Sequence, residues 1–197
     1  FKFTVHEAWC EIMADVPKGL ESLMRHAQGS DPKALPPVKN WNPPHCGDIG
    51  LKIDGQGRWF YQGSPITRAP LVRLFSTILR KDPDGYVLVT PVEKVSVAVE
   101  DAPFLAVELA REGEGENQRL ALRTSVDDWV EIGPDHPLRF QADDKGFKPY
   151  VLVRDELWAL LSRPLALQLV ELAVEDGPFM GLWSNAMFFP LNDGTDP

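Results

Sequence analysis

The sequence is poor in cysteine and has no closely spaced set of metal ligands. Among its 197 residues there are two cysteines, Cys10 and Cys46, and no Cys-x-x-Cys pair. Disulfide-stabilised folds use several cysteines at regular spacings. Zinc sites use separated ligand pairs, whereas His45 and Cys46 are adjacent. The sequence therefore predicts reduced thiols and no metal site.

Glycine-rich phosphate loops are also missing. The chain contains neither a Walker A pattern nor Gly-x-Gly-x-x-Gly, the loops that bind phosphates in many nucleotide hydrolases and dinucleotide enzymes. We therefore predict that the protein binds no cofactor and is not an enzyme. One catalytic arrangement stays open, a Cys46 nucleophile with His136 as its base, because such pairs meet in space rather than in sequence.

Long hydrophobic runs and an excess of basic residues are absent as well. No apolar run approaches the roughly 20 residues that span a bilayer, and the first residues lack the basic and apolar regions of a signal peptide. The net charge is -9, which argues against binding to nucleic acid or to an anionic membrane. We expect a cytoplasmic protein without membrane or nucleic-acid partners.

The chain does have enough apolar residues for a core, since 44% of it is hydrophobic. Strand-like runs dominate, and the helical stretches do not alternate with them as in a parallel sheet. The predicted class is α+β. We predict an arm with a short helix at residues 1–35, a first domain at 36–103 and a second at 104–197.

Two helical stretches stand out. Apolar residues recur at helical spacing between Thr67 and Arg80, with Thr67 as the cap and Pro70 in the first turn. Residues 155–173 have a second helical pattern that contains Pro164. Proline in a helix interior removes a hydrogen bond, so this stretch is predicted to kink or split.

The two halves of the sequence share a weak internal repeat. Both run through a strand, a strand with Trp59 or Trp129, a glycine, a proline followed by an aliphatic residue, a helix, Asp-Gly and a further strand. The second half carries an insertion. Recurrence of this kind is typical of duplication, so the sequence predicts two similar strand-rich units, each with a helix.

A basic island in this acidic chain suggests a small anionic ligand. Residues 68–81 carry four positive charges and no acid, so they could steer an anion. Arg68, Arg73, Lys94 and Arg139 are the predicted phosphate contacts, because guanidinium and ammonium groups match phosphate oxygens. The alternative is a solvated surface or ordinary ion pairs. For Arg80 and Lys81, stabilisation of a helix C-terminus is a separate explanation.

The stretch Asn-Trp-Asn-Pro-Pro at residues 40–44 has a restricted backbone, because each proline fixes its own φ and favours extended geometry before it. It could present Trp41 for stacking on a base and Asn40 or Asn42 for hydrogen bonding to the base edge. The alternative is that Trp41 covers the core. Cys46-Gly47-Asp48 is predicted to turn the chain into the first strand, and Asp48 is included among the ligand contacts.

The corner at residues 135–139, Asp-His-Pro-Leu-Arg, is the second-half counterpart of Gly63–Ile66. It is either a rigid turn or the wall of a site in which His136 or Arg139 faces a ligand.

The sequence also resembles a known bacterial family, the domain of unknown function 1285. The resemblance spans about residues 36 to 191 and rests on the segments PPVKNWNPPHCGDIGLKI, WFYQGSPITRAPLVRLFSTILRKDPDGYVLVTPVEK, VEDAPF, GPDHPLRF and PYVLVR. It implies a duplicated α+β core, a pleckstrin-homology-like C-terminal half, a groove between the domains for a nucleotide-like ligand, and a role in signalling. It implies no enzymatic activity.

These observations predict a non-enzymatic sensor or adaptor that binds a small nucleotide-like ligand at the domain interface, in signal transduction. Two alternatives stay open. One is a protein-interaction module that docks a partner through a sheet edge or the N-terminal arm. The other is a hydrolase or transferase that uses Cys46 or His136.

Overall fold

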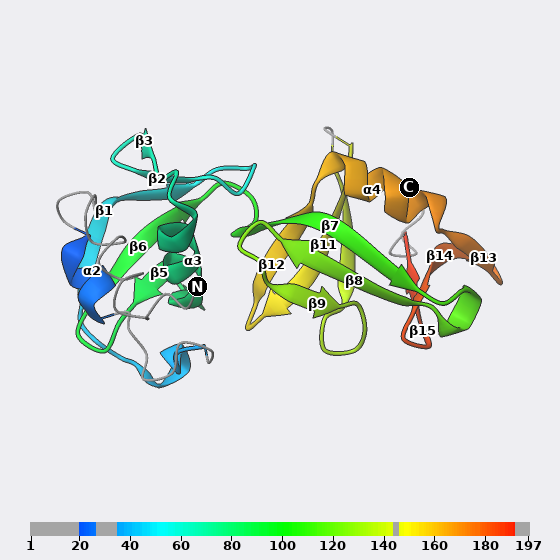
Figure 1. The fold of residues 1–197 in the computed structure, drawn as a ribbon, viewed down its shortest axis with the longest axis horizontal. Helices are drawn as coiled ribbons and strands as arrows, with labels where there is room; N and C mark the ends of the chain where they lie inside the picture. The colour runs from blue at the N-terminus through cyan, green and yellow to red at the C-terminus, as the bar shows by residue number, and fades with distance from the viewer. Residues whose placement is uncertain (1–19, 27–34, 144–145, 192–197) are drawn as a thin grey trace, which may run out of the picture. The chain divides into compact units, whose positions relative to one another are not determined.

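The computed structural model describes residues 20–26, 35–143 and 146–191 of the chain. The chain divides into two compact units between Glu100 and Asp101, and each unit has its own sheet and its own core (Figure 1). Most of the predicted N-terminal arm, including Cys10, lies outside the described residues.

The first unit is built on a six-stranded sheet, sheet A, in the order β3-β2-β1-β6-β5-β4. β1 and β6 are parallel, and the other neighbouring pairs are antiparallel. The elements are α2 (Glu21–His26), η1 (Val38–Asn40), β1 (His45–Ile53), β2 (Trp59–Tyr61), β3 (Ser64–Pro65), α3 (Ala69–Thr77), β4 (Leu79–Asp82), β5 (Gly85–Val89) and β6 (Lys94–Val99).

The second unit has a six-stranded sheet B, in the order β10-β11-β12-β7-β8-β9, and a three-stranded sheet C, in the order β13-β14-β15. In sheet B only β7 and β12 are parallel among the described pairs. The elements are β7 (Phe104–Glu112), η2 (Gly115–Asn117), β8 (Arg119–Thr124), β9 (Trp129–Glu131), β10 (Leu138–Asp143), β11 (Gly146–Arg154), β12 (Leu157–Leu161), α4 (Arg163–Glu171), β13 (Val174–Asp176), β14 (Phe179–Ser184) and β15 (Met187–Pro190).

Sheets A and B share one topology. Each consists of two three-stranded antiparallel meanders, and the first strand of the first meander pairs in parallel with the last strand of the second. The prediction of two similar strand-rich units is therefore confirmed. The class needs correction, because the described chain is mostly β with few helices rather than α+β.

The recurring sequence pattern equates the strand of Trp59 with that of Trp129, but these two strands are not equivalent in the two sheets. Trp59 lies in β2, the second strand of its meander, whereas Trp129 lies in β9, the third strand. Their environments also differ, since Trp59 is 1% exposed and Trp129 is 51% exposed. In the first unit α3 lies between the meanders, but α4 follows β12, after both meanders are complete. The similarity of the two units is thus visible in their strand topology and not in the positions of the two tryptophans.

The core of the first unit lies between sheet A and its helices. Phe75 of α3 is fully buried, and its ring centroid is 6.0 Å from that of Trp59 in β2. Leu20, Leu23 and Met24 are each at most 1% exposed, so the apolar side chains at the short N-terminal helix are buried in the protein. Burial of large apolar side chains is the main stabilising contribution to such a core.

The predicted helix at 67–80 is shorter than expected. It spans Ala69–Thr77, its N-cap is Arg68 rather than Thr67, and Pro70 lies in its first turn as predicted. Leu79 and Arg80 belong to β4, where they pair with Leu88 and Val87. The explanation of Arg80 as a helix-terminal cation is therefore wrong.

The second helical prediction is wrong in its first half. Residues 157–161 form β12, whose side chains alternate between buried and half-buried positions. Pro164 neither kinks nor splits a helix, because it lies in the first turn of α4, where the missing N–H has no intrahelical partner to lose.

Candidate functional site

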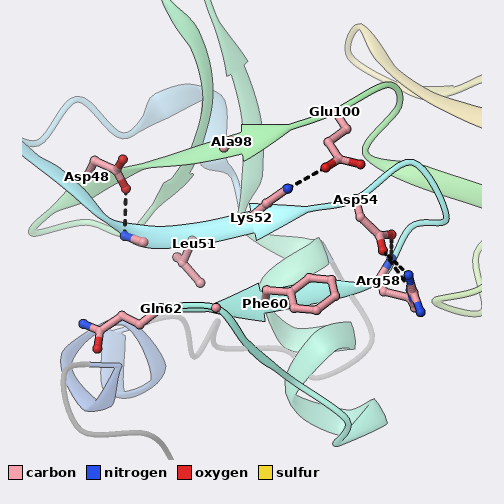
Figure 2. A pocket seen from close by; sticks show the side chains of 11 residues that line it. Asp48, Leu51, Lys52, Asp54, Arg58, Phe60, Gln62, Ala98 and Glu100 are labelled. Atoms are coloured by element: carbon pink, nitrogen blue, oxygen red, sulfur yellow. Dashed lines mark hydrogen bonds and ion pairs between the residues drawn. The ribbon is translucent and has the colours of Figure 1, made fainter.

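A pocket of about 620 Å³ lies in the first unit, on the face of sheet A opposite its buried core (Figure 2). Leu51 of β1 and Val97 of β6 are paired and buried, whereas the next pair, Lys52 and Ala98, is exposed. Because side chains alternate across a strand, Lys52 and Ala98 lie on the other face. We call this the open face of sheet A. The pocket is lined by Asp48, Gly50, Leu51, Lys52, Asp54, Arg58, Phe60, Gln62, Gly63, Ala98 and Glu100.

One end of the pocket is the turn between β1 and β2, where Asp54 is 8% exposed. Its carboxylate accepts the N–H groups of Gln56 and Arg58, each at 2.9 Å, and the Arg58 Nε–H at 2.8 Å. Burial acts to raise the pKa of Asp54, but the hydrogen bonds from Arg58 and Gln56 outweigh it and hold the pKa below its ordinary value of 3.8. Asp54 is thus an ionised group that fixes the turn between β1 and β2.

A second ion pair crosses the pocket between β1 and the end of β6. Lys52 Nζ lies 2.5 Å from Glu100 Oε1, and Glu100 Oε2 accepts the Gly55 N–H at 2.8 Å. The hydrogen bonds from Lys52 and Gly55 hold the pKa of Glu100 below its ordinary value. Both cations at this pocket, Lys52 and Arg58, therefore already have a carboxylate partner.

Asp48 lies at the opposite end of the pocket from that turn (Figure 2). Gly47 and Gly50 flank it with φ of +87° and +83°, and the pairing of β1 with β6 shifts register on both sides of Asp48. Bulges of this kind redirect side chains. The prediction that Cys46-Gly47-Asp48 precedes the strand is thus wrong, since β1 begins at His45. The Asp48 carboxylate accepts the Gly50 N–H at 2.7 Å and is paired with no cation of the described residues.

In the second unit, Arg139 stacks on two aromatic rings of sheet B. Its guanidinium carbon lies 4.4 Å from the ring centroid of Trp158 and 5.1 Å from that of Tyr150. The three side chains come from β10, β11 and β12, and we call them the Arg139 cluster. Arg139 is exposed, and within the described part of the chain no carboxylate pairs with it. Cation–π contacts hold a guanidinium by its face and leave its in-plane donors available.

Asp101 is hydrogen-bonded to Tyr150 of this cluster and to the neighbouring Lys148. It accepts the Tyr150 hydroxyl at 2.7 Å and Lys148 Nζ at 3.0 Å. Burial, followed by the hydrogen bond to Asp101, raises the pKa of Tyr150 to about 12. Tyr150 is therefore a neutral ring at physiological pH, oriented by its hydroxyl.

Trp41 and Lys94 meet in a different network, at the β4 edge of sheet A. Arg80 Nη1 donates to the carbonyl oxygens of Val38 and Trp41, and Arg80 Nε donates to Asp82 at 2.6 Å. Lys94 Nζ donates to the same carboxylate at 2.9 Å. The Trp41 carbonyl and Lys94 thus belong to one structural network, and for Lys94 this is the ordinary ion pair stated as its alternative. The position of the Trp41 side chain relative to a ligand stays a prediction.

The other predicted contacts of the first unit are not gathered at the pocket. Asn42 is exposed in the segment before β1, Arg68 caps α3, and Arg73 is exposed on α3. Only Asp48 among the predicted site residues lines the pocket. Whether these groups and Arg139 share one interface stays a prediction, since it concerns both units.

The imidazole ring of His136 is hydrogen-bonded to the backbone of β11. Its Nδ1 lies 2.9 Å from the Leu152 carbonyl oxygen, so Nδ1 is the donor of this hydrogen bond. Cys46 is exposed in the first unit, so its pairing with His136 of the second unit also stays a prediction. In the described ranges, no group of three or more His, Cys, Asp or Glu side chains could hold a metal ion. No helix among the described residues is long and apolar enough to cross a membrane.

Sequence reasoning missed Lys52, Arg58, Phe60 and Glu100 at the pocket. Polar residues at the even positions Asp48, Lys52 and Asp54, along β1 and into the turn after it, indicate an exposed strand face, and this pattern is visible in the sequence. The partners of Arg139 had no such signal, because Tyr150 and Trp158 are brought to it by strand register.

The comparisons with known proteins agree with this architecture. Residues 36–102 match the family described as "Domain of unknown function (DUF1285), N-terminal domain", and residues 103–191 match "Protein of unknown function (DUF1285), C-terminal domain". No curated protein matches the chain.

Two solved structures of DUF1285 proteins are similar to it. The one from Silicibacter pomeroyi DSS-3 is 44% identical with a TM-score of 0.79, over 86% of this chain and 93% of that one. The one from Shewanella baltica OS155 is 31% identical with a TM-score of 0.50, over 62% of this chain and 91% of that one. The two family matches together cover most of the chain, and the protein therefore belongs to the DUF1285 family.

Proposed function

We propose that the protein is a non-enzymatic sensor or adaptor in signal transduction, and that it binds a small nucleotide-like ligand through Arg139. The observation that carries the proposal is the Arg139 cluster. A guanidinium stacked on Trp158 and Tyr150, with no carboxylate partner among the described residues, has its N–H donors directed away from the rings. Two oxygens of a phosphate group can accept hydrogen bonds from two N–H donors of such a guanidinium.

The local charge favours an anion at this position. Lys148 is a second cation on the neighbouring strand β11, and its partner Asp101 is also engaged by the Tyr150 hydroxyl. The pocket of the first unit is less suitable for phosphate, since its two cations are already paired with carboxylates. The pleckstrin-homology-like character implied by the family resemblance for the second half is part of this proposal.

The proposal is tested by isothermal titration calorimetry with AMP, GMP, CMP and UMP, and the corresponding nucleosides are the uncharged controls. We expect at least one nucleotide to bind and its nucleoside to bind much more weakly. Arg139→Gln should weaken nucleotide binding at least about tenfold, the difference expected when a charge-assisted contact is lost. Arg111→Gln is the control, because Arg111 is an exposed arginine of the same sheet.

Arg139→Lys separates charge from the stacked fork. If stacking positions the guanidinium, lysine should restore only part of the affinity. Unchanged binding in Arg139→Gln, or equal binding of nucleotide and nucleoside, would count against the proposal. Unfolding by urea, measured for each variant, distinguishes a lost contact from a destabilised second unit.

A protein-interaction module is the second candidate, and one observation favours it. Register places Val174, Phe179, Trp183 and Phe188 on the same face of sheet C, and Val174 and Phe179 are 43% and 45% exposed. Exposed apolar faces of this kind are typical of interaction sites. Analytical ultracentrifugation of the wild type and of Phe179→Ser tests this candidate, since self-association that disappears in the variant would support it.

A further inference from the structure

The second binding feature of this protein is the pocket on the open face of sheet A. We propose that it binds a small organic amine, with the ammonium group at Asp48 and an apolar body against Phe60 and Ala98. The residues of this site belong to the first unit, and those of the Arg139 cluster belong to the second.

The charges of the pocket select a cation rather than an anion. Its titratable groups are three carboxylates, Asp48, Asp54 and Glu100, and two cations, Lys52 and Arg58. Two ion pairs use both cations and two of the carboxylates. Asp48 is left with a negative charge and a single backbone donor, the Gly50 N–H. An anion would have to displace Glu100 from Lys52 or Asp54 from Arg58, whereas an ammonium group at Asp48 displaces neither.

Asp48 is fixed in position, which a binding carboxylate requires. The bulges at Gly47 and Gly50 direct its segment, and the hydrogen bond from the Gly50 N–H orients the carboxylate. A side chain at Gly50 would meet Gln62 at 3.2 Å, and the Gly50 φ of +83° is rarely adopted by other residues, so the bulge requires glycine here. The Gln62 side chain lies at the same end of the pocket (Figure 2). Its amide nitrogen donates to the Tyr61 hydroxyl at 3.2 Å, which leaves the amide oxygen as a second acceptor for an ammonium group.

Apolar side chains flank the middle of the pocket. Phe60 of β2 and Ala98 of β6 lie on either side of Lys52 of β1, and the Lys52 ammonium is drawn toward Glu100 by its ion pair, which leaves the aliphatic stem of Lys52 between them (Figure 2). The volume of about 620 Å³ is within the usual range for small-molecule sites. An amine with a ring or a short aliphatic chain satisfies both the charge at Asp48 and the apolar surface at Phe60.

The test is a titration with 2-phenylethylamine, followed by backbone amide shifts in ¹⁵N-labelled protein. Its two matched probes are 2-phenylethanol and 3-phenylpropionate, which keep the ring and replace the ammonium by a hydroxyl or a carboxylate. We expect shifts at Gly50, Gln62 and Ala98, with the amine bound at least about tenfold more tightly than the alcohol. The propionate should be the weakest of the three.

Asp48→Asn is the decisive variant. Asparagine can still accept the Gly50 N–H through its side-chain oxygen, so the bulge is kept while the charge is lost. The variant should bind the amine no better than the alcohol. Phe60→Leu should weaken the amine and the alcohol alike. Glu171→Gln, at an exposed glutamate of α4, should have no effect.

The proposal would be overturned if no amide shift occurs at up to about 10 mM amine, which is about tenfold above a weak Kd of about 1 mM. Equal affinity for the amine and the alcohol would also overturn it, and so would a preference for the amine that persists in Asp48→Asn. The result is independent of the nucleotide proposal, because Arg139→Gln should leave amine binding unchanged.

Discussion

Arg80 Nη1 lies 2.7 Å from the carbonyl oxygen of Trp41, and the same nitrogen lies 2.7 Å from the carbonyl oxygen of Val38. Arg80 belongs to β4, which is an edge strand of sheet A. Its side chain thus fastens the proline-rich segment before β1 to that edge. Edge strands are open to unwanted pairing, and covering them is a common protection. The rigidity of residues 36–44 therefore has a structural use that does not depend on a ligand.

Replacing Arg80 by methionine should destabilise the first unit. The change keeps the apolar stem but leaves the Trp41 carbonyl without its donor, removes one of the two donors to the Val38 carbonyl, and leaves Asp82 without its closest partner. Since hydrogen bonds from charged groups contribute about 1.5 to 3 kcal/mol, we expect a loss of about 2 to 3 kcal/mol in unfolding free energy. Urea denaturation measures it, with the exposed Arg111→Met as control. Equal stability of the two variants would show that the network contributes little.

Asp82 should make stability depend on pH at the acidic end. The hydrogen bond from Arg80, with a further one from Lys94, holds its pKa below the ordinary value of 3.8 in the folded protein. The carboxylate is therefore stabilising above about pH 3.8, and this contribution is lost as the pH falls through the lower folded pKa. Asp82→Asn should be less stable at neutral pH and should lose less stability on acidification. Asp84→Asn, an exposed neighbour in the same turn, should keep the wild-type pH profile.

Tyr150 should titrate far above an ordinary tyrosine. Burial and the hydrogen bond to Asp101 raise its pKa to about 12 from an ordinary 10. Its contribution to stability is thus complete below about pH 10 and is lost as the pH rises toward 12. In Asp101→Asn the burial remains but the negative charge is gone, so the pKa should fall part of the way to 10. Phenolate absorbance follows the titration, and Asp135→Asn, at an exposed acid, is the control. An unchanged alkaline titration in Asp101→Asn would contradict this account.

Local chemistry explains which parts of the fold could be predicted. The Asp-Gly and Gly residues at 54–57 are typical of a hairpin turn, and the Asp54 N–H closes the turn between β1 and β2 by donating to the Arg58 carbonyl at 3.0 Å. The helix ends could not be predicted, because Ile78 and Leu79 fit an apolar helix face and a buried strand equally well. The pairing of Leu79 with Leu88 in β5 decides between them, and that contact is not local.

The same limit applies to the candidate sites. Arg139 was predicted as a ligand contact from its charge, but its stacking on Trp158 depends on the register of three strands. Lys94 was predicted on the same grounds, and it is bound to Asp82. Charge alone therefore finds both a candidate contact and a structural cation. Only the position of the partner carboxylate separates them.

Gly181 should tolerate no side chain, which tests the packing of sheet C. A Cβ there would lie 2.4 Å from Cζ of Phe188 and 2.6 Å from the carbonyl oxygen of Phe189. The ring could rotate away only at the expense of its contact with Trp183, whose centroid is 5.3 Å distant, and the carbonyl belongs to the paired strand β15. Overpacking of this kind costs about 1 to 3 kcal/mol. Gly181→Ala should therefore lower the unfolding free energy by that amount and weaken the near-ultraviolet circular dichroism of Trp183. Gly55→Ala is the control, because the nearest atom to its Cβ is a side-chain oxygen at 3.7 Å, an ordinary contact. If the two variants lose the same stability, Phe188 does not lie over Gly181 in solution, and the aromatic face of sheet C would have to be arranged differently.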